Sequence, residues 1–152
     1  MAYDSTNNAY ILTNMDTKSK VIPIPVLDNV EKFTIEADIK RNNSRVGLGI
    51  ANAKNYGYIF GVDNSSMAAW KYTNASWSNL GDTSATITEW VHLKLTINGL
   101  NVTVSLTNTN GNTYTKNVTM DSRYSTRSVG IGVASQYSNR TGYIKNIKAE
   151  SL

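Results

Sequence analysis

Apolar residues alternate with polar or small residues along most of this chain, and that period of two indicates β-strands. Helical periodicity is scarce. We expect strands at residues 9–13, 20–24, 33–40, 45–51, 56–62, 67–72, 86–97, 102–108, 112–120, 128–135 and 142–150. Because no helices separate these segments, the sheets should be antiparallel and stacked on each other. The sequence therefore predicts an all-β fold, a two-sheet antiparallel β-sandwich of the jelly-roll type.

Two of these segments carry glycines on one face. Residues 45–51 read RVGLGIA and residues 128–134 read SVGIGVA, so valine, leucine and isoleucine point one way while Gly47, Gly49, Gly130 and Gly132 leave the other face nearly bare. Glycine weakens a strand, which suggests that a ligand or another backbone approaches closely there. If the two strands are neighbours, they form the floor of a groove.

Turn residues support the same fold. The dipeptide Asn98-Gly99 is typical of a tight hairpin between residues 91 and 108. Both prolines, Pro23 and Pro25, lie in the segment VIPIPV, and proline cannot donate to a strand ladder. We therefore expect that segment at a sheet edge or at the end of a strand.

Composition excludes several classes of protein. The 152 residues are most simply one domain, 1–152, and the absence of cysteine excludes disulfides and thiolate metal sites. Lysine and arginine outnumber acidic residues by 15 to 11, but they are scattered, so we expect no nucleic-acid partner. No apolar run approaches the roughly 20 residues of a membrane span, so we expect no membrane insertion.

Three segments together resemble the concanavalin A-like lectin and glucanase superfamily, which includes laminin-G-like and carbohydrate-binding modules. They are FTIEADIK at residues 33–40, EWVHLKLTING at residues 89–99, and VGIGV at residues 129–133 leading to GYIKNI at residues 142–147. The resemblance implies two curved sheets, sugar binding on the concave face or its rim loops, and a structural role for Trp90. Similar modules occur in phage tail, baseplate and neck proteins, so it also implies a virion-surface or extracellular location.

Candidate catalytic residues are few. Sandwich glucanases of this superfamily resemble one another in carrying Glu-x-Asp-x-Glu on one strand face, and here Glu36 and Asp38 are followed by Lys40 instead of the third acid. A glycosidase needs two facing carboxylates, so this motif is incomplete. The single histidine, His92, has no Asp or Ser within its local motif to complete a catalytic triad. We therefore expect that the protein is not an enzyme.

Metal ligands are also sparse. One histidine excludes a histidine cluster. Asp63, Asn64 and Asp82 lie in expected loops and offer oxygen atoms for a structural calcium ion, but no dense acidic loop is present. We expect no metal site and no cofactor, with structural calcium as the open alternative.

The aromatic residues are the stronger lead, because sugar C–H faces stack on rings while hydroxyls bond to polar groups. Trp70 and Tyr72 share strand parity, and Trp77 lies in a polar stretch expected to be a loop. Trp70 is equally compatible with the core, and Trp77 with anchoring its loop. The predicted ligand-binding residues around the glycine floor are Arg45, Trp70, Tyr72, Trp77, Tyr137 and Asn139.

These observations together predict a non-catalytic carbohydrate-binding module that recognises a cell-surface polysaccharide, as part of a phage or cell-surface protein. Weak individual sites would gain affinity from multiple copies. The alternative is a structural module of a virion or surface complex, in which the bare face packs against a neighbouring subunit and binds no sugar.

Overall fold

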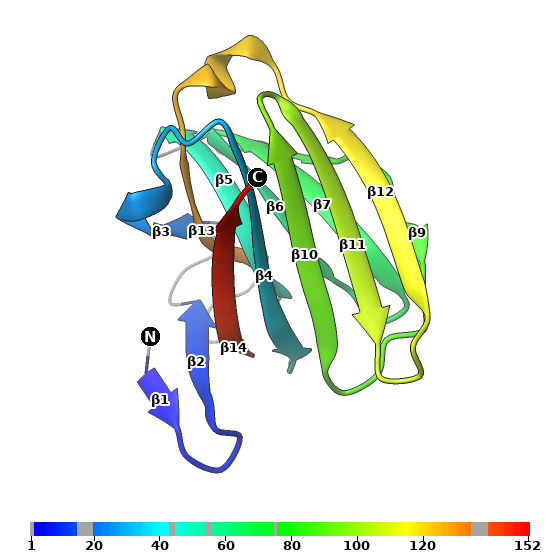
Figure 1. The fold of residues 1–152 in the computed structure, drawn as a ribbon. Helices are drawn as coiled ribbons and strands as arrows, with labels where there is room; N and C mark the ends of the chain where they lie inside the picture. The colour runs from blue at the N-terminus through cyan, green and yellow to red at the C-terminus, as the bar shows by residue number, and fades with distance from the viewer. Residues whose placement is uncertain (1, 15–19, 43–44, 54–55, 75, 135–139) are drawn as a thin grey trace.

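The computed structural model describes residues 2–14, 20–42, 45–53, 56–74, 76–134 and 140–152. These residues form two antiparallel sheets packed face to face as a jelly-roll β-sandwich (Figure 1). The first sheet has the order β1 (Ala2–Asp4), β2 (Ala9–Asn14), β14 (Arg140–Ser151), β4 (Lys32–Arg41), β10 (Val91–Asn98), β11 (Asn101–Asn108) and β12 (Thr113–Thr119). The predicted fold is confirmed.

The second sheet has the order β3 (Lys20–Pro23), β13 (Ser128–Ala134), β5 (Arg45–Ala53), β6 (Tyr56–Val62), β7 (Ser66–Thr73) and β8 (Ser76–Asn79), and β9 (Thr83–Ser84) also pairs with β7. Short 3-10 turns, η1 (Pro25–Leu27) and η2 (Ser122–Ser125), lie in the connections between the two sheets. Within the described residues no helix is long and apolar enough to cross a membrane.

The core lies between the sheets and follows the alternation read from the sequence. In β10 the side chains of Val91, Leu93, Leu95 and Ile97 are buried, while His92 and Lys94 between them are only partly covered. Such a strand stabilises the fold by removing one apolar face from water, about 25 cal/mol per Å². The polar side chains on the other face of the first sheet remain accessible to solvent and to a ligand.

Several predicted boundaries are confirmed and others are not. The hairpin at Asn98 and Gly99 joins β10 to β11, and β3 with its proline lies at the edge of the second sheet. Residues 86–90, however, precede β10 and are not strand, because Thr88 and Asn108 side chains bond to backbone there. The strands β1, β8 and β9 were not expected, since each is short and lacks a clear alternation.

The buried side chain of Arg127 forms hydrogen bonds with several of the segments that connect the strands. Its terminal nitrogens donate to the carbonyl oxygens of Gly99, Tyr124, Val30 and Glu31 at 2.5 to 3.3 Å. These carbonyls belong to the β10–β11 turn, to η2 and to the segment before β4. One guanidinium therefore joins three segments that are distant in sequence.

Candidate functional site

The glycine-rich strands are neighbours, which was the condition for a groove, but they do not form an open floor. Gly49 pairs with Gly130, and Gly47 pairs with Gly132. All four residues are buried. A Cβ at Gly49 would lie 2.6 Å from Cγ2 of Val21, and a Cβ at Gly132 would lie 2.9 Å from Cγ2 of Ile59. The expectation of a solvent-open glycine groove is therefore wrong at this face.

The glycines instead make room for neighbouring side chains and strands. A Cβ at Gly47 would overlap the Phe60 carbonyl oxygen and lie 2.8 Å from Cα of Gly61. At Gly130 the overlap is with the backbone of Ile22. The sequence suggested that either a ligand or another backbone approaches these glycines closely. Close approach of another backbone explains Gly47 and Gly130.

The outer face of the second sheet carries a small apolar cluster. Ile59, Ala68, Trp70 and Tyr72 form it, with Val21 packed against it. Trp70 and Tyr72 are only 3% and 4% exposed, and the ring of Tyr72 lies against Gly57. Burial also raises the pKa of Tyr72 to about 12. The structure thus places these two rings in a packed layer, so the solvent-open aromatic patch expected from their parity is not present.

The structure does not describe the side chains of the remaining predicted contacts. Tyr137 and Asn139 lie outside the described residues, as do the side chains of Arg45 and Trp77. The backbone does show that Trp77 belongs to β8, paired with Tyr72, and so not to a loop as expected. Their role in ligand binding stays a prediction.

The outer face of the first sheet has the opposite character. Strands β14, β4 and β10 are adjacent there, and their outward positions carry charged, amide and aromatic side chains. We call this surface the polar face, and its residues are Glu36, Asp38, Lys40, Trp90, His92, Lys94, Tyr143, Lys145, Asn146 and Lys148. Trp90 lies in the bend just before β10, and the strand ladders hold the other groups in fixed positions.

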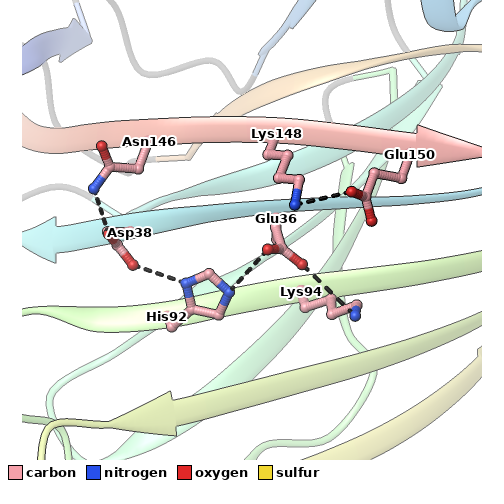
Figure 2. A network of polar contacts seen from close by, with 7 residues as sticks. All are labelled: Glu36, Asp38, His92, Lys94, Asn146, Lys148 and Glu150. Atoms are coloured by element: carbon pink, nitrogen blue, oxygen red, sulfur yellow. Dashed lines mark hydrogen bonds and ion pairs between the residues drawn. The ribbon is translucent and has the colours of Figure 1, made fainter.

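His92 occupies the middle of a network across the three strands (Figure 2). Its Nδ1 lies 2.8 Å from Oδ1 of Asp38, and its Nε2 lies 3.8 Å from Oε1 of Glu36. Lys94 completes the row, with Nζ 3.6 Å from Oε2 of Glu36. The side chains of His92 and Lys94 are 40% and 43% exposed, so the network is open to solvent.

A β-bulge brings Asn146 into this network. The pairing of β14 with β4 shifts between Lys145 and Lys148, and Asn146 has a φ of 55°. Asparagine tolerates this left-handed conformation better than most residues. From there its Nδ2 donates to Oδ2 of Asp38 at 2.8 Å. Bulges of this kind redirect a side chain, and they are common next to functional sites.

Cations and aromatic rings gather at one end of the polar face, which we call the aromatic end: Lys40, Trp90, Tyr143 and Lys145. Nζ of Lys145 is 4.0 Å from the centre of the Trp90 ring, a cation–π contact. Nζ of Lys40 is 5.3 Å from the Tyr143 ring and 6.0 Å from the Trp90 ring, and it forms a 2.8 Å ion pair with Glu89. The two rings therefore flank a lysine beside the His92 network.

The environment of the Asp38 carboxyl group should make the free energy of unfolding depend on pH. Partial burial raises its pKa, but hydrogen bonds from Asn146 and His92 and the charge of Lys145 outweigh burial and lower it below the ordinary value of 3.8. A lowered pKa stabilises the folded state above the unfolded pKa, and that contribution disappears as the pH falls through the folded value. The free energy of unfolding of the wild type should thus fall as the pH is lowered below about 4. In Asp38→Asn, the free energy of unfolding should fall less steeply with pH.

Urea unfolding at a series of acidic pH values checks this prediction. Asp28→Asn, at an exposed aspartate outside the polar face, is the matched control. Equal slopes for wild type and Asp38→Asn would show that the bonds to Asp38 do not persist in solution.

The described residues contain no group of three histidine or acidic side chains placed to hold a metal ion. Asp63, one of the loop acids considered for calcium, lies 3.6 Å from Nη2 of Arg41, and Asp82 is exposed. The absence of a metal site, with structural calcium as the alternative, stays a prediction.

Sequence reasoning placed Glu36, Asp38 and Lys40 on one face but missed the site as a whole. The partner of His92 is Asp38, 54 positions away, and no local motif reveals that pairing. The register of β4 against β10, which pairs Asp38 with His92 and Glu36 with Lys94, is the signal that would have found it. Trp90, to which the resemblance gives a structural role, lies partly exposed beside two lysines, and that role stays a prediction.

Comparison with known proteins places the fold but not the family. No family model matches the chain, and no curated protein sequence does. Solved structures of similar fold include a carbohydrate-binding module, CBM66 from Bacillus subtilis, with a TM-score of 0.59 and 18% identity over 94% of this chain and 82% of that one. Another is the CBM2 module of the evolved Dit of Lactobacillus casei BL23 phage J-1, with a TM-score of 0.58 and 10% identity over 98% and 78%.

An enzyme has the same fold in part of its chain. A xylan β-1,4-xylosidase from Bacillus halodurans C-125 matches with a TM-score of 0.73 and 10% identity over 95% of this chain. The match spans only 33% of the xylosidase. This finding corrects the expectation that the protein is not an enzyme, since the fold also occurs in enzyme chains. The fold is thus a β-sandwich shared by carbohydrate-binding modules and carbohydrate-active enzymes.

Proposed function

We propose that this protein binds a polysaccharide of a cell surface through the polar face. The observation that carries the proposal is the aromatic end beside the His92 network. Rings can stack on the C–H faces of sugars while carboxylates, ammonium groups and an amide bond to hydroxyls. The shared fold with two carbohydrate-binding modules supports the proposal.

The charges of the polar face favour a ligand rich in hydroxyl groups. Glu36 and Asp38 each have a cationic or imidazole partner within 4 Å, and Lys40 is paired with Glu89. Lys148 is paired with the neighbouring Glu150 at 2.8 Å. Four lysines are therefore balanced by four carboxylates, those of Glu36, Asp38, Glu89 and Glu150, and the face has no strong field of one sign. A neutral sugar chain suits that arrangement better than a highly charged one.

The setting that we propose is the surface of a virion or cell. One of the modules of similar fold belongs to a phage Dit protein, which supports this setting. In such an assembly, repeated copies would raise a weak single-site affinity by multivalency. Neighbouring subunits of the assembly would be the other partners.

Removing the indole of Trp90 should weaken binding strongly. A stacked ring contributes about 1 kcal/mol or more, so Trp90→Ala should raise the dissociation constant about tenfold, and Trp90→Phe should recover part of the loss. The measurement is affinity electrophoresis through gels that contain xylan, β-glucan or cell-wall polysaccharide purified from a Gram-positive bacterium.

Val26→Ser is the control, because Val26 is 80% exposed in η1 and lies outside the polar face. Thermal unfolding of each variant shows whether it is folded. Retardation of the wild type with unchanged retardation of folded Trp90→Ala would reject the polar face as the site. No retardation by any of the three polysaccharides would count against the proposed function.

A further inference from the structure

A row of directly paired residues crosses the outer face of the first sheet. Lys145 pairs with Asp38, and Asp38 pairs with His92. Beyond His92 the row continues through Thr107 of β11 to Thr113 of β12. Residues that are paired in this way point to the same side of a sheet. The polar face is therefore continuous with the outer faces of β11 and β12, which lie beside β10 (Figure 1).

The outward positions of β11 and β12, two strands that the structure describes throughout, carry only neutral polar side chains. The residues that alternate with them in β11 are buried, which assigns the outward set. We call this surface the hydroxyl strip, and its residues are Asn101, Thr103, Ser105, Thr107, Thr113, Thr115, Asn117 and Thr119. It offers hydroxyl and amide groups without the ion pairs of the polar face.

A hydrogen-bonded pair of threonines lies where the row reaches the hydroxyl strip. Oγ1 of Thr107 and Oγ1 of Thr113 are 2.9 Å apart. A hydroxyl both donates and accepts, so the pair keeps a free O–H and further lone pairs after bonding to itself. Because their mutual bond already orients the two hydroxyls, a ligand that binds them pays little to order them.

The other end of the row lies at the aromatic end, since Nζ of Lys145 is 4.0 Å from the centre of the Trp90 ring. A sugar that stacks on Trp90 is therefore next to the start of the row. Two directions lead away from it over the sheet. One follows the strands toward Lys94, and the other crosses them toward Thr113.

The free energy of desolvation favours the direction across the strands. Along the strands, Glu36 lies 3.8 Å from His92 and 3.6 Å from Lys94. Lys148 is paired there with Glu150 at 2.8 Å. A neutral chain over these groups would remove charges from water without supplying an opposite charge. Across the strands the charged groups end at His92, and the hydroxyls beyond it can bond to sugar hydroxyls.

We propose that Thr107 and Thr113 form a second contact for the polysaccharide, so that a chain stacked on Trp90 crosses β10 and β11 to reach β12. This inference rests on the proposed function and adds a direction and a minimum length to it. Neighbouring strands are about 4.8 Å apart, so the path from β14 to β12 covers about 19 Å, which is longer than one sugar ring. The ligand is thus an internal stretch of a neutral sugar chain, several units long.

The test removes the two hydroxyls and keeps the shape of the surface. In a gel containing whichever of xylan, β-glucan or Gram-positive cell-wall polysaccharide retards the wild type, Thr107→Val/Thr113→Val should bind about fivefold more weakly. That factor is expected for the loss of two neutral hydrogen-bonding groups. Thermal unfolding should change little, because both residues lie on the surface and valine suits a strand.

The matched control is Thr103→Val/Thr119→Val, on the same two strands and the same face. The hydroxyls of Thr103 and Thr119 donate to Asn117 and Asn101 at 2.9 and 3.1 Å, so they resemble the tested pair but lie outside the row. Retardation of this control should equal that of the wild type. Chain length gives a second readout: a free hexasaccharide of the same polysaccharide should relieve wild-type retardation at a lower concentration than the disaccharide.

The outcomes separate this inference from the proposed function. If Trp90→Ala weakens binding and Thr107→Val/Thr113→Val does not, the second contact is wrong while the polar face stands. Equal losses for the tested pair and for Thr103→Val/Thr119→Val, or equal competition by the two oligosaccharides, also overturn the inference. A wild type that is not retarded in any of the three gels overturns both the inference and the proposed function.

Discussion

Arg127→Met should be the most destabilising substitution at a polar residue of this protein. Methionine has a similar length but no donors, so the carbonyl groups of Gly99, Tyr124, Val30 and Glu31 would lose their bonds to the guanidinium. Leaving one buried and three partly buried acceptors unpaired should lower the free energy of unfolding by about 3 kcal/mol. Urea unfolding monitored by tryptophan fluorescence measures this change.

Two further variants make the result specific. Arg127→Lys keeps a charge but lacks the planar fork, so its stability should fall between methionine and wild type. Arg123→Met removes a guanidinium whose side chain is 46% exposed, and it should cost less than about 1 kcal/mol. Equal losses for Arg127→Met and Arg123→Met would show that the buried network does not hold the connections together.

Gly47→Ala should be the most damaging of the small substitutions. A Cβ at Gly47 meets backbone atoms of β6, and strands joined by a hydrogen-bonded ladder cannot move apart without losing that ladder. We expect a loss of about 3 kcal/mol, at the upper end of the usual cost of overpacking. Differential scanning calorimetry of the variant gives the change in stability.

Gly57→Ala is the matched control on the next strand. There the added Cβ meets the end of the Tyr72 side chain rather than backbone, so the side chain can adjust and the cost should be about 1 kcal/mol. Equal stability of Gly47→Ala and wild type would mean that β5 and β6 are not as close as the structure shows.

The periodicity of the sequence was sufficient for the architecture, because strand parity is a local property. Alternation in residues 91–97 identified the buried face of β10, and Pro23 identified an edge strand. The glycine pattern also indicated close approach of another group to β5 and β13, which are neighbours in the structure. It could not show what lies over them, since Val21 and Ile59 reach the glycines from other strands.

The candidate site was harder to predict because it depends on register between strands. His92 contacts Asp38 of β4, and Asp38 in turn accepts a hydrogen bond from Asn146 in the bulge of β14. The lysine that breaks the glucanase-like motif, Lys40, becomes understandable only in space, where it lies between Trp90 and Tyr143. Trp77 was read as a loop residue because the four-residue strand β8 carries no alternating apolar signal.

An amide NMR titration tests the location of the binding site most directly. When the polysaccharide that retards the wild type is added as soluble oligosaccharides, the largest shift changes should fall on Asp38, His92, Asn146 and the indole N–H of Trp90. Shift changes confined to β5, β6, β7 and β13 would instead place the sugar on the second sheet and contradict the assignment of the polar face.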